Sequence, residues 1–503
     1  MSADMDSADQ NLTRRATASS IWMIAARLVV RFSDLLLLML LTRLLAPSDF
    51  GLVAIAVSVV AILDVVTDLP LATPLVRLEK PSKVHMDTAF VLGILRGLLI
   101  FAAAVVLAQP VATFFGDPRL APLMLVLAAG SALYNLRSPR MAILFKRLEF
   151  RQSFIVEVGG KMVGLIAAII GAFWLESYWA LTISPVVSRS MSVLLSYRYA
   201  PYQPGLSLRE WRYFWEFLSW MIPSQFIIAL SWQFDRLFLG RVIPIEQLGF
   251  YSVASTVTSI IEQTVRRAVT GPLISGFVLA STDPARLRRG YLLADNAIFS
   301  LGAPVYVGTF CLADPMVRLA FGQDWIVAAP FLGGLALAML PALVRIPFRP
   351  LAMAAGQTRY VFIIAVWSLA LRIPAVTGGY AFGGVQGVIL GIGLANIGNA
   401  LVAMFCVRKV VEGLTFGVQM SANGRTLVAL LPMFIFTWWA GSEMDDMPIG
   451  ATLVAVFLGV SLLTIVIHAA SVLFVWRLSG RPDGIESRAF ATLRKRTMPS
   501  NAS

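Results

Sequence analysis

Two stretches of the sequence decide the fold: GLVAIAVSVVAILDVVTDLPLATPLV at 51–76 and GFYSVASTVTSIIEQTVRRAVTGPLI at 249–274. Each is long enough to cross a bilayer as a helix, because a span needs about 20 mostly apolar residues. The two stretches also align at one constant offset, which pairs Gly51 with Gly249 and Asp64 with Glu262. An even number of expected spans separates them. The chain is therefore predicted to contain two related halves with the same orientation in a membrane.

The composition of the whole chain agrees with a membrane protein. Of its 503 residues, 58% are hydrophobic and 14% are charged. A soluble domain carries about 25% charged residues, so this chain has too few to cover a water-exposed surface. A soluble enzyme and a disordered protein are excluded. The two cysteines, Cys311 and Cys406, lie far apart in apolar runs and form neither a disulfide framework nor a metal-binding pattern.

The basic residues predict how the chain is oriented. About 14 candidate spans are separated by loops too short for a soluble catalytic domain. Lys and Arg concentrate in every second loop, and this asymmetry places those loops and both termini in the cytoplasm. The tenth expected span, 325–344, ends before Arg345 and Arg349, which we therefore assign to a cytoplasmic loop. The net charge of +13 mainly reflects orientation, and no nucleic-acid partner is expected.

We therefore expect an all-α polytopic membrane protein with two parallel six-helix lobes and a C-terminal helix pair. Parallel repeats are a known transporter architecture, with the substrate path between the repeats. Glycines at 383–393 are expected to permit close helix packing. The predicted segments are a cytoplasmic start (1–17), an N-lobe (18–197), a cytoplasmic linker (198–212), a C-lobe (213–407), two further helices (426–476) and a basic cytoplasmic tail (477–503).

Charged residues inside the expected spans need an explanation, because one at the bilayer centre costs at least about 2.5 kcal/mol. They must form ion pairs, extend to the interface or line a hydrated cavity. Glu157–Lys161 and Asp235–Arg236 are candidates for structural ion pairs. Glu216 and Asp295 lie near cytoplasmic ends of their spans, so their side chains are expected to reach the interface.

The remaining arginines suggest an anion site, since a guanidinium stays charged and binds phosphate oxygens in pairs. Their spacing puts Arg27, Arg31 and Asp34 on one helix face, and Glu262 and Arg266 on another. We expect a cationic, substrate-binding cavity formed by Arg27, Arg31, Lys161, Arg189, Arg266 and Arg267. Four acids are either ion-pair partners or groups that couple transport to an ion: Asp34, Asp64, Asp68 and Glu262. His85 and His468 stand apart, so the sequence predicts no metal site, cofactor or catalytic group.

Several motifs resemble those of Wzx-type polysaccharide flippases of the MOP superfamily, in the branch that includes colanic-acid and teichuronic-acid exporters. The resemblance covers about residues 15–480. It is carried by LTRLLAPSDFGLVAIAVSVVAILDVVTDLPLATPLV (41–76), FKRLEFRQ (145–152) and FDRLFLGRVIPIEQLGFYSVA (234–254).

This resemblance implies a non-enzymatic flippase for undecaprenyl-diphosphate-linked oligosaccharides in the bacterial inner membrane. It implies alternating access and a groove for the lipid tail that the last two helices form or border. It also implies membrane lipids, a polysaccharide polymerase and a chain-length regulator as partners. The family's basic cavity residues match Arg27, Arg31, Arg266 and Arg267, whereas the second span departs from the pattern with Asp64 and Asp68.

Two other function classes compete with this interpretation. An ion-coupled multidrug exporter of the same superfamily would favour twelve spans and an acidic cavity, and Asp34 and Asp64 keep this alternative open. A membrane-bound polymerase or glycosyltransferase would favour a large catalytic loop, and the expected loops are short. The flippase fits the basic interior and the two additional spans better than either.

Overall fold

The computed structural model describes residues 25–26, 28–69, 71–78, 81–146, 149–218 and 222–480. Regular structure in these ranges is helical, without strands. The chain divides into two compact units, Met1–Ser252 and Val253–Ser503. Arg27, the N-terminal segment 1–17 and all but the start of the tail 477–503 lie outside the described residues, as do the side chains of Glu216 and Arg267.

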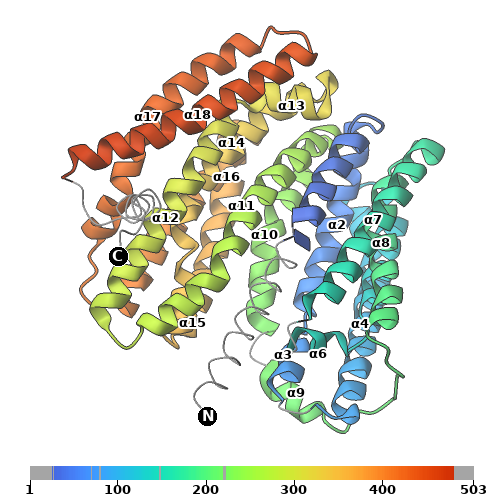
Figure 1. Ribbon diagram of the computed structural model, residues 1–503. Helices are drawn as coiled ribbons and strands as arrows, with labels where there is room; N and C mark the ends of the chain where they lie inside the picture. The colour runs from blue at the N-terminus through green and yellow to red at the C-terminus, as the bar shows by residue number, and fades with distance from the viewer. Residues whose placement is uncertain are drawn as a thin grey trace, which may run out of the picture. The chain divides into compact units, whose positions relative to one another are not determined.

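The first unit is a bundle of long helices with short helices at one end. Figure 1 shows α3, α6 and α9 gathered at the same end, while α7 and α8 run side by side. After the helical residues 28–41, its elements are α2 (Pro47–Val66), α3 (Ala72–Arg77), α4 (Lys83–Phe115), α5 (Leu120–Tyr134), α6 (Met141–Lys146), α7 (Phe150–Leu175), α8 (Trp179–Tyr199), α9 (Trp211–Leu218) and α10 (Ile222–Val242). α11 (Ile245–Ala280) begins in this unit.

The first turns of α2 and α11 cross with their backbones in contact. A Cβ atom added to Gly51 would lie 2.0 Å from the carbonyl oxygen of Ile245, and one added to Gly249 would lie 1.8 Å from that of Pro47. The contact is reciprocal, because the offset that pairs Gly51 with Gly249 also pairs Pro47 with Ile245. Only glycine permits this approach. Equivalent residues of the two repeats thus contact each other at this crossing, and a local two-fold axis relates the two contacts.

The second unit comprises the rest of α11 and the elements that follow it. α17 and α18 lie side by side (Figure 1), as expected for the C-terminal helix pair. The elements are α12 (Pro284–Cys311), α13 (Ala313–Phe321), η1 (Gln323–Ala328), α14 (Ala329–Met339), η2 (Leu340–Arg345), α15 (Phe348–Ala354), α16 (Thr358–Val410), α17 (Phe416–Met444) and α18 (Ala451–Leu478).

α16 is two helices joined at a sharp break. Gly383 and Gly384 have non-helical backbone angles, and Gly384 adopts a φ of 57°, a region that favours glycine. The two halves then pack closely, because a Cβ added to Gly387 would lie 1.9 Å from the carbonyl oxygen of Gly379. The predicted close packing is confirmed at Gly387 and Gly391, whereas a Cβ added to Gly383 or Gly384 would meet no atom within 4 Å.

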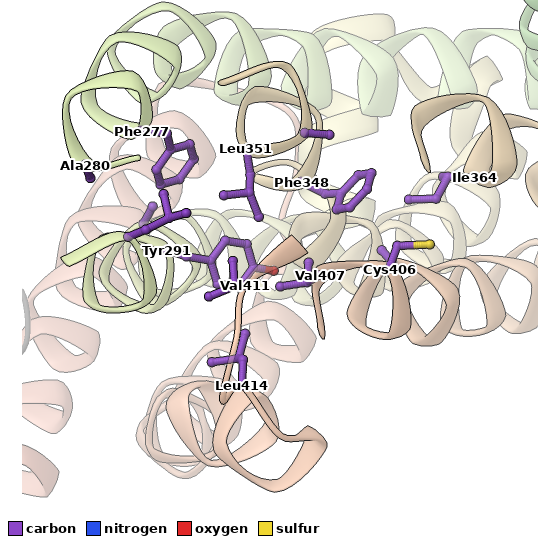
Figure 2. Close-up of a cluster of buried hydrophobic side chains, with 14 residues drawn as sticks. Phe277, Ala280, Tyr291, Phe348, Leu351, Ile364, Cys406, Val407, Val411 and Leu414 are labelled. Carbon is purple, nitrogen blue, oxygen red and sulfur yellow. The ribbon is translucent and has the colours of Figure 1, made fainter. Parts of the chain in front are cut away.

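A buried apolar cluster fixes the segment between α14 and α16. Figure 2 shows Phe348 and Leu351 of α15 among Tyr291 of α12 and Cys406 and Val407 of α16, and all five side chains are buried. Dense packing of this kind leaves little freedom for the connected backbone. The cluster therefore also fixes the chain on either side of Phe348.

The end of α17 is held by a buried arginine. Arg318 of α13 donates hydrogen bonds to the main-chain oxygens of Met444 (3.1 Å), Asp445 (2.5 Å) and Met447. These are carbonyls at the C-terminus of a helix, where intrahelical partners are lacking. Arg318 thereby connects α13 to the turn between α17 and α18.

Length and composition make this a multi-pass membrane protein. Seven helices in the described ranges are able to span a membrane, or eight if α12 and α13, bent by 75°, form one span. The total of 14 spans and the lobe boundaries at 18–197 and 213–407 remain predictions. The expected end of the tenth span at residue 344 differs from the structure, where the candidate span runs over Gln323–Ala354. Buried Leu343, Ile346 and Phe348 continue the apolar segment past Arg345, so this candidate span includes Arg345 and Arg349.

Candidate functional site: charged networks in the two units

In the first unit, one carboxylate binds two cations. Asp34 pairs with Arg31 of its own helix at 3.4 Å and with Lys161 of α7 at 2.5 Å. The predicted face shared by Arg31 and Asp34 is confirmed. The suggested Glu157–Lys161 pair is not found, since Glu157 is exposed and the Lys161 ammonium extends across to the first helix. Lys161 therefore pairs with an acid of a neighbouring helix and not with the acid four residues before it on its own helix.

A second carboxylate links α2, α5 and α8. Asp64 Oδ2 accepts a hydrogen bond from Ser131 Oγ at 2.8 Å and lies 3.2 Å from Arg189 Nη2. Arg189 Nη1 also donates to Ser131 Oγ. The three side chains form a closed triangle, and all are at most partly exposed. The structure thus gives Arg189, predicted to lie in the cavity, an acidic partner.

Arg96 of α4 extends this network along α2. Its Nη2 atom lies 3.3 Å from Asp68 Oδ1 and donates to the carbonyl oxygen of Asp64 at 2.8 Å. Its Nη1 atom donates to Asn135 Oδ1 at 2.9 Å. Arg96 and Asn135 were not among the predicted site residues. Asp34, Asp64 and Asp68 therefore each have at least one cationic partner.

In the second unit, two arginines interact with one carboxylate and two more interact with these arginines. Glu262 and Arg266, both on α11, form the predicted i,i+4 pair at 3.6 Å. Arg345 of η2 interacts electrostatically with Glu262, Arg266 and Arg372. Arg349 of α15 also interacts with Arg266. We call Arg266, Arg345, Arg349 and Arg372 the arginine cluster.

This cluster has an electrostatic cost that an anion would relieve. Like charges that lie close together in a protein repel each other. Among the electrostatic partners of Arg345, one is a carboxylate and two are guanidiniums. Since arginine does not lose its proton in proteins, the repulsion cannot be removed by deprotonation. The arrangement is suited to an anion with several oxygens.

Other charged residues of the spans also have partners. Asp235 accepts a hydrogen bond from Tyr251 at 3.0 Å, and its charge acts on Arg236; the Asp235–Arg236 ion pair stays a prediction. The prediction that Asp295 extends to the interface was wrong. Asp295 is 1% exposed, and its Oδ2 atom accepts a hydrogen bond of 2.7 Å from Asn423 of α17. The reason is that α17 covers this part of α12, which the position of Asp295 in the sequence does not reveal.

The predicted cavity residues thus fall into two sets. Arg31, Lys161 and Arg189 lie in the first unit, and Arg266 lies in the second. Sequence reasoning missed Arg345 and Arg349, although two arginines within a continuing apolar stretch were a usable signal. Within the described residues, no group of three or more His, Cys, Asp or Glu side chains is arranged to hold a metal.

Comparison with protein families and curated sequences gives consistent matches. A family model described as "Polysaccharide biosynthesis protein" matches residues 40–330. The lipopolysaccharide biosynthesis protein WzxC of Escherichia coli (strain K12) is 23% identical over 86% of this chain and 88% of its own length. The succinoglycan biosynthesis transport protein ExoT of Rhizobium meliloti (strain 1021) is 27% identical over 70% of this chain and 71% of its own.

Solved structures show the same fold. The lipid II flippase MurJ in an inward closed conformation aligns with a TM-score of 0.69 and 15% identity, covering 92% of this chain and 99% of that one. An inward-facing multidrug MATE transporter of the MOP superfamily aligns with a TM-score of 0.62 and 16% identity, covering 77% and 98%. At these identities the match establishes the helical transporter fold and nothing about the substrate.

Proposed function

The chain belongs to the family of polysaccharide biosynthesis proteins, and on this basis we propose that it is a flippase for lipid-linked oligosaccharides. Its cargo would be repeat units joined to undecaprenyl diphosphate, moved from the cytoplasmic to the outer leaflet of the bacterial inner membrane. The names of WzxC and ExoT, which refer to polysaccharide biosynthesis and transport, support this proposal. The flippase breaks and forms no covalent bond, and both termini are cytoplasmic.

The arginine cluster is the observation that carries the proposal. A diphosphate is the part of the cargo common to every repeat unit, and its oxygens match guanidinium donors in pairs. Its four arginines come from four elements, and Glu262 offsets part of the charge of Arg266 and Arg345. Diphosphate binding would relieve the repulsion between the arginines. Neutral sugars would require no such charge.

We assign a supporting role to the charged residues of the first unit. Arg31, Lys161 and Arg189 are proposed to face the substrate path, together with Arg27 of the same unit and Arg267 of the other unit. The contacts of Arg31, Lys161 and Arg189 with Asp34 and Asp64 favour the ion-pair role for these acids over the ion-coupling role. A carboxylate oxygen that already accepts from a guanidinium or ammonium donor has fewer lone pairs left for a coupling ion.

Alternating access of the lobes 18–197 and 213–407 completes the proposed mechanism. α17 and α18 carry many exposed apolar side chains, such as Leu431, Ile435, Leu458 and Leu462, which suits contact with the lipid tail. A polymerase and a chain-length regulator would receive the flipped unit. Export of cationic drugs, the alternative, is disfavoured because the arginine cluster would repel them.

The test is complementation of a strain that lacks this protein. We expect the double variant Arg345→Gln/Arg372→Gln to reduce surface polysaccharide at least ~10-fold and to accumulate lipid-linked repeat units, since a hydrogen bond to a charged group contributes about 1.5–3 kcal/mol. The matched control is Arg286→Gln/Arg289→Gln, two exposed arginines of α12. Protein levels in the membrane are measured for every variant. Normal polysaccharide from a well-expressed Arg345→Gln/Arg372→Gln variant would refute the role of the cluster.

A further inference from the structure

A pocket in the first unit is lined by none of the residues of the two charged networks. It has a volume of about 580 Å³, within the range of small-molecule sites. It is formed by the start of α4, the segment before α6, the end of α8 and the segment that follows α8. Two basic and two aromatic side chains contribute to its lining, which comprises Lys83, Met86, Arg140, Tyr197, Pro201, Tyr202 and Gln203.

Hydrogen bonds hold the walls of this pocket in place. Arg140 Nη1 donates to the carbonyl oxygen of Pro201 at 2.6 Å, and Ser138 Oγ donates to that of Ala200 at 2.8 Å. Tyr197 donates to the carbonyl oxygen of Leu136 at 2.9 Å. The segment after α8 is therefore tied to the segment before α6. A ligand would meet a largely preformed site, which lowers the entropy cost of binding.

The charge in the pocket favours an anion. Lys83 is the first residue of α4, where the helix end adds a partial positive charge. The nearby carboxylate of Asp87 is buried and accepts hydrogen bonds from Tyr202 and from the Gly205 amide (3.3 Å). Burial and the bond to Asp87 raise the pKa of Tyr202, so its phenol remains neutral. The Arg140 guanidinium has further N–H donors besides the one used by Pro201.

The surroundings of the pocket have the character of a membrane interface. The segment after α8 exposes Leu206 at 84%, and Leu208 and Trp211 follow as exposed side chains. The basic residues Arg209 and Arg212 lie among them, also exposed. Tryptophan and arginine beside exposed apolar groups are typical of segments lying in the head-group region. The pocket is thus placed where phospholipid head groups are abundant.

We propose that this pocket binds the head group of an anionic phospholipid, with its phosphate between Lys83 and Arg140. The glycerol part of the head group would pack against Tyr197 and Tyr202. Anionic lipids are attracted to basic sites on the cytoplasmic side of membrane proteins, at about 1 kcal/mol for each basic residue. The bound lipid would hold α4, α8 and their connecting segments to the bilayer surface. This site is separate from the arginine cluster, which belongs to the other unit.

Native mass spectrometry of the full-length protein tests this proposal. The protein is released from nanodiscs containing equal amounts of phosphatidylglycerol and phosphatidylcholine, and the retained lipids are counted. We expect the wild type to retain one more phosphatidylglycerol than Lys83→Gln/Arg140→Gln. The control variant Arg286→Gln/Arg289→Gln should match the wild type. Equal retention by the wild type and the Lys83→Gln/Arg140→Gln variant would overturn the proposal.

Two further measurements separate binding from folding and from the proposed cargo. The Lys83→Arg variant should retain as much phosphatidylglycerol as the wild type. The Lys83→Gln variant should retain less, and it leaves the hydrogen bond of Arg140 to the main chain intact. The preparation is then titrated with undecaprenyl diphosphate up to equimolar amounts. We expect the phosphatidylglycerol to stay bound. Its displacement would assign the pocket to the carrier lipid and contradict the phospholipid site.

Discussion

Alanine at Gly249 should force α2 and α11 apart at their first turns. Its Cβ would lie 1.8 Å from the carbonyl oxygen of Pro47. Because real contacts of this kind are about 3 Å or longer, the backbones must separate by more than roughly 1 Å, and such overpacking costs about 1–3 kcal/mol. Gly51→Ala should have a similar effect, since its Cβ would lie 2.0 Å from the oxygen of Ile245.

The reciprocal geometry makes a sharper prediction for the double variant. Both clashes occur between the same two helix turns, so one separation relieves both. Gly51→Ala/Gly249→Ala should therefore cost clearly less than the sum of the single variants, a non-additivity typical of residues in contact. Two residues that clashed independently would instead give additive costs.

The assay is thermal unfolding of the purified protein in detergent, followed by tryptophan fluorescence. Each single variant should lower Tm by several degrees, at about 2–4 °C per kcal/mol for a unit of this size. Gly276→Ala is the control, because a Cβ there would meet no atom within 4 Å and alanine favours the helix. An unchanged Tm for Gly249→Ala, or strict additivity in the double variant, would refute the reciprocal crossing.

Two further predictions concern the buried polar contacts. Asp64→Asn should lower stability by about 1–3 kcal/mol, and a double-mutant cycle with Arg189→Gln in thermal unfolding should show coupling of that order; zero coupling would contradict the pairing at 3.2 Å. Asn423→Leu should lower the free energy of unfolding by about 1–3 kcal/mol, because it removes the hydrogen-bond donor to the buried carboxylate of Asp295. Adding Asp295→Asn should recover part of the lost Tm, and the absence of any recovery would argue against that contact.

The sequence predicted the features that depend on local spacing. The Arg31–Asp34 and Glu262–Arg266 pairs follow from positions three and four residues apart on a helix. The correspondence of Gly51 with Gly249 was also visible, because a repeat needs only the chain itself. These features require no knowledge of which helices are neighbours.

The features that were missed depend on packing between helices. Lys161 has an acid four residues away on its own helix, and yet it pairs with Asp34 across the bundle. Arg345 looked like the edge of a loop because a charge usually ends an apolar stretch, but buried neighbours carry the segment onward. The burial of Asp295 depends on α17, more than 120 residues later. No pattern within one helix encodes such partners.

The contacts of Arg318 determine which amino-acid substitutions the end of α17 can accept during evolution. This side chain binds the main-chain oxygens of Met444, Asp445 and Met447, and every amino acid supplies such an oxygen. Substitutions at these three positions therefore preserve the acceptors, provided that the backbone path is kept. A substitution of Arg318 removes all three bonds at once. This contact at the end of α17 thus tolerates substitutions on the side that supplies the oxygens and depends on one side chain on the other.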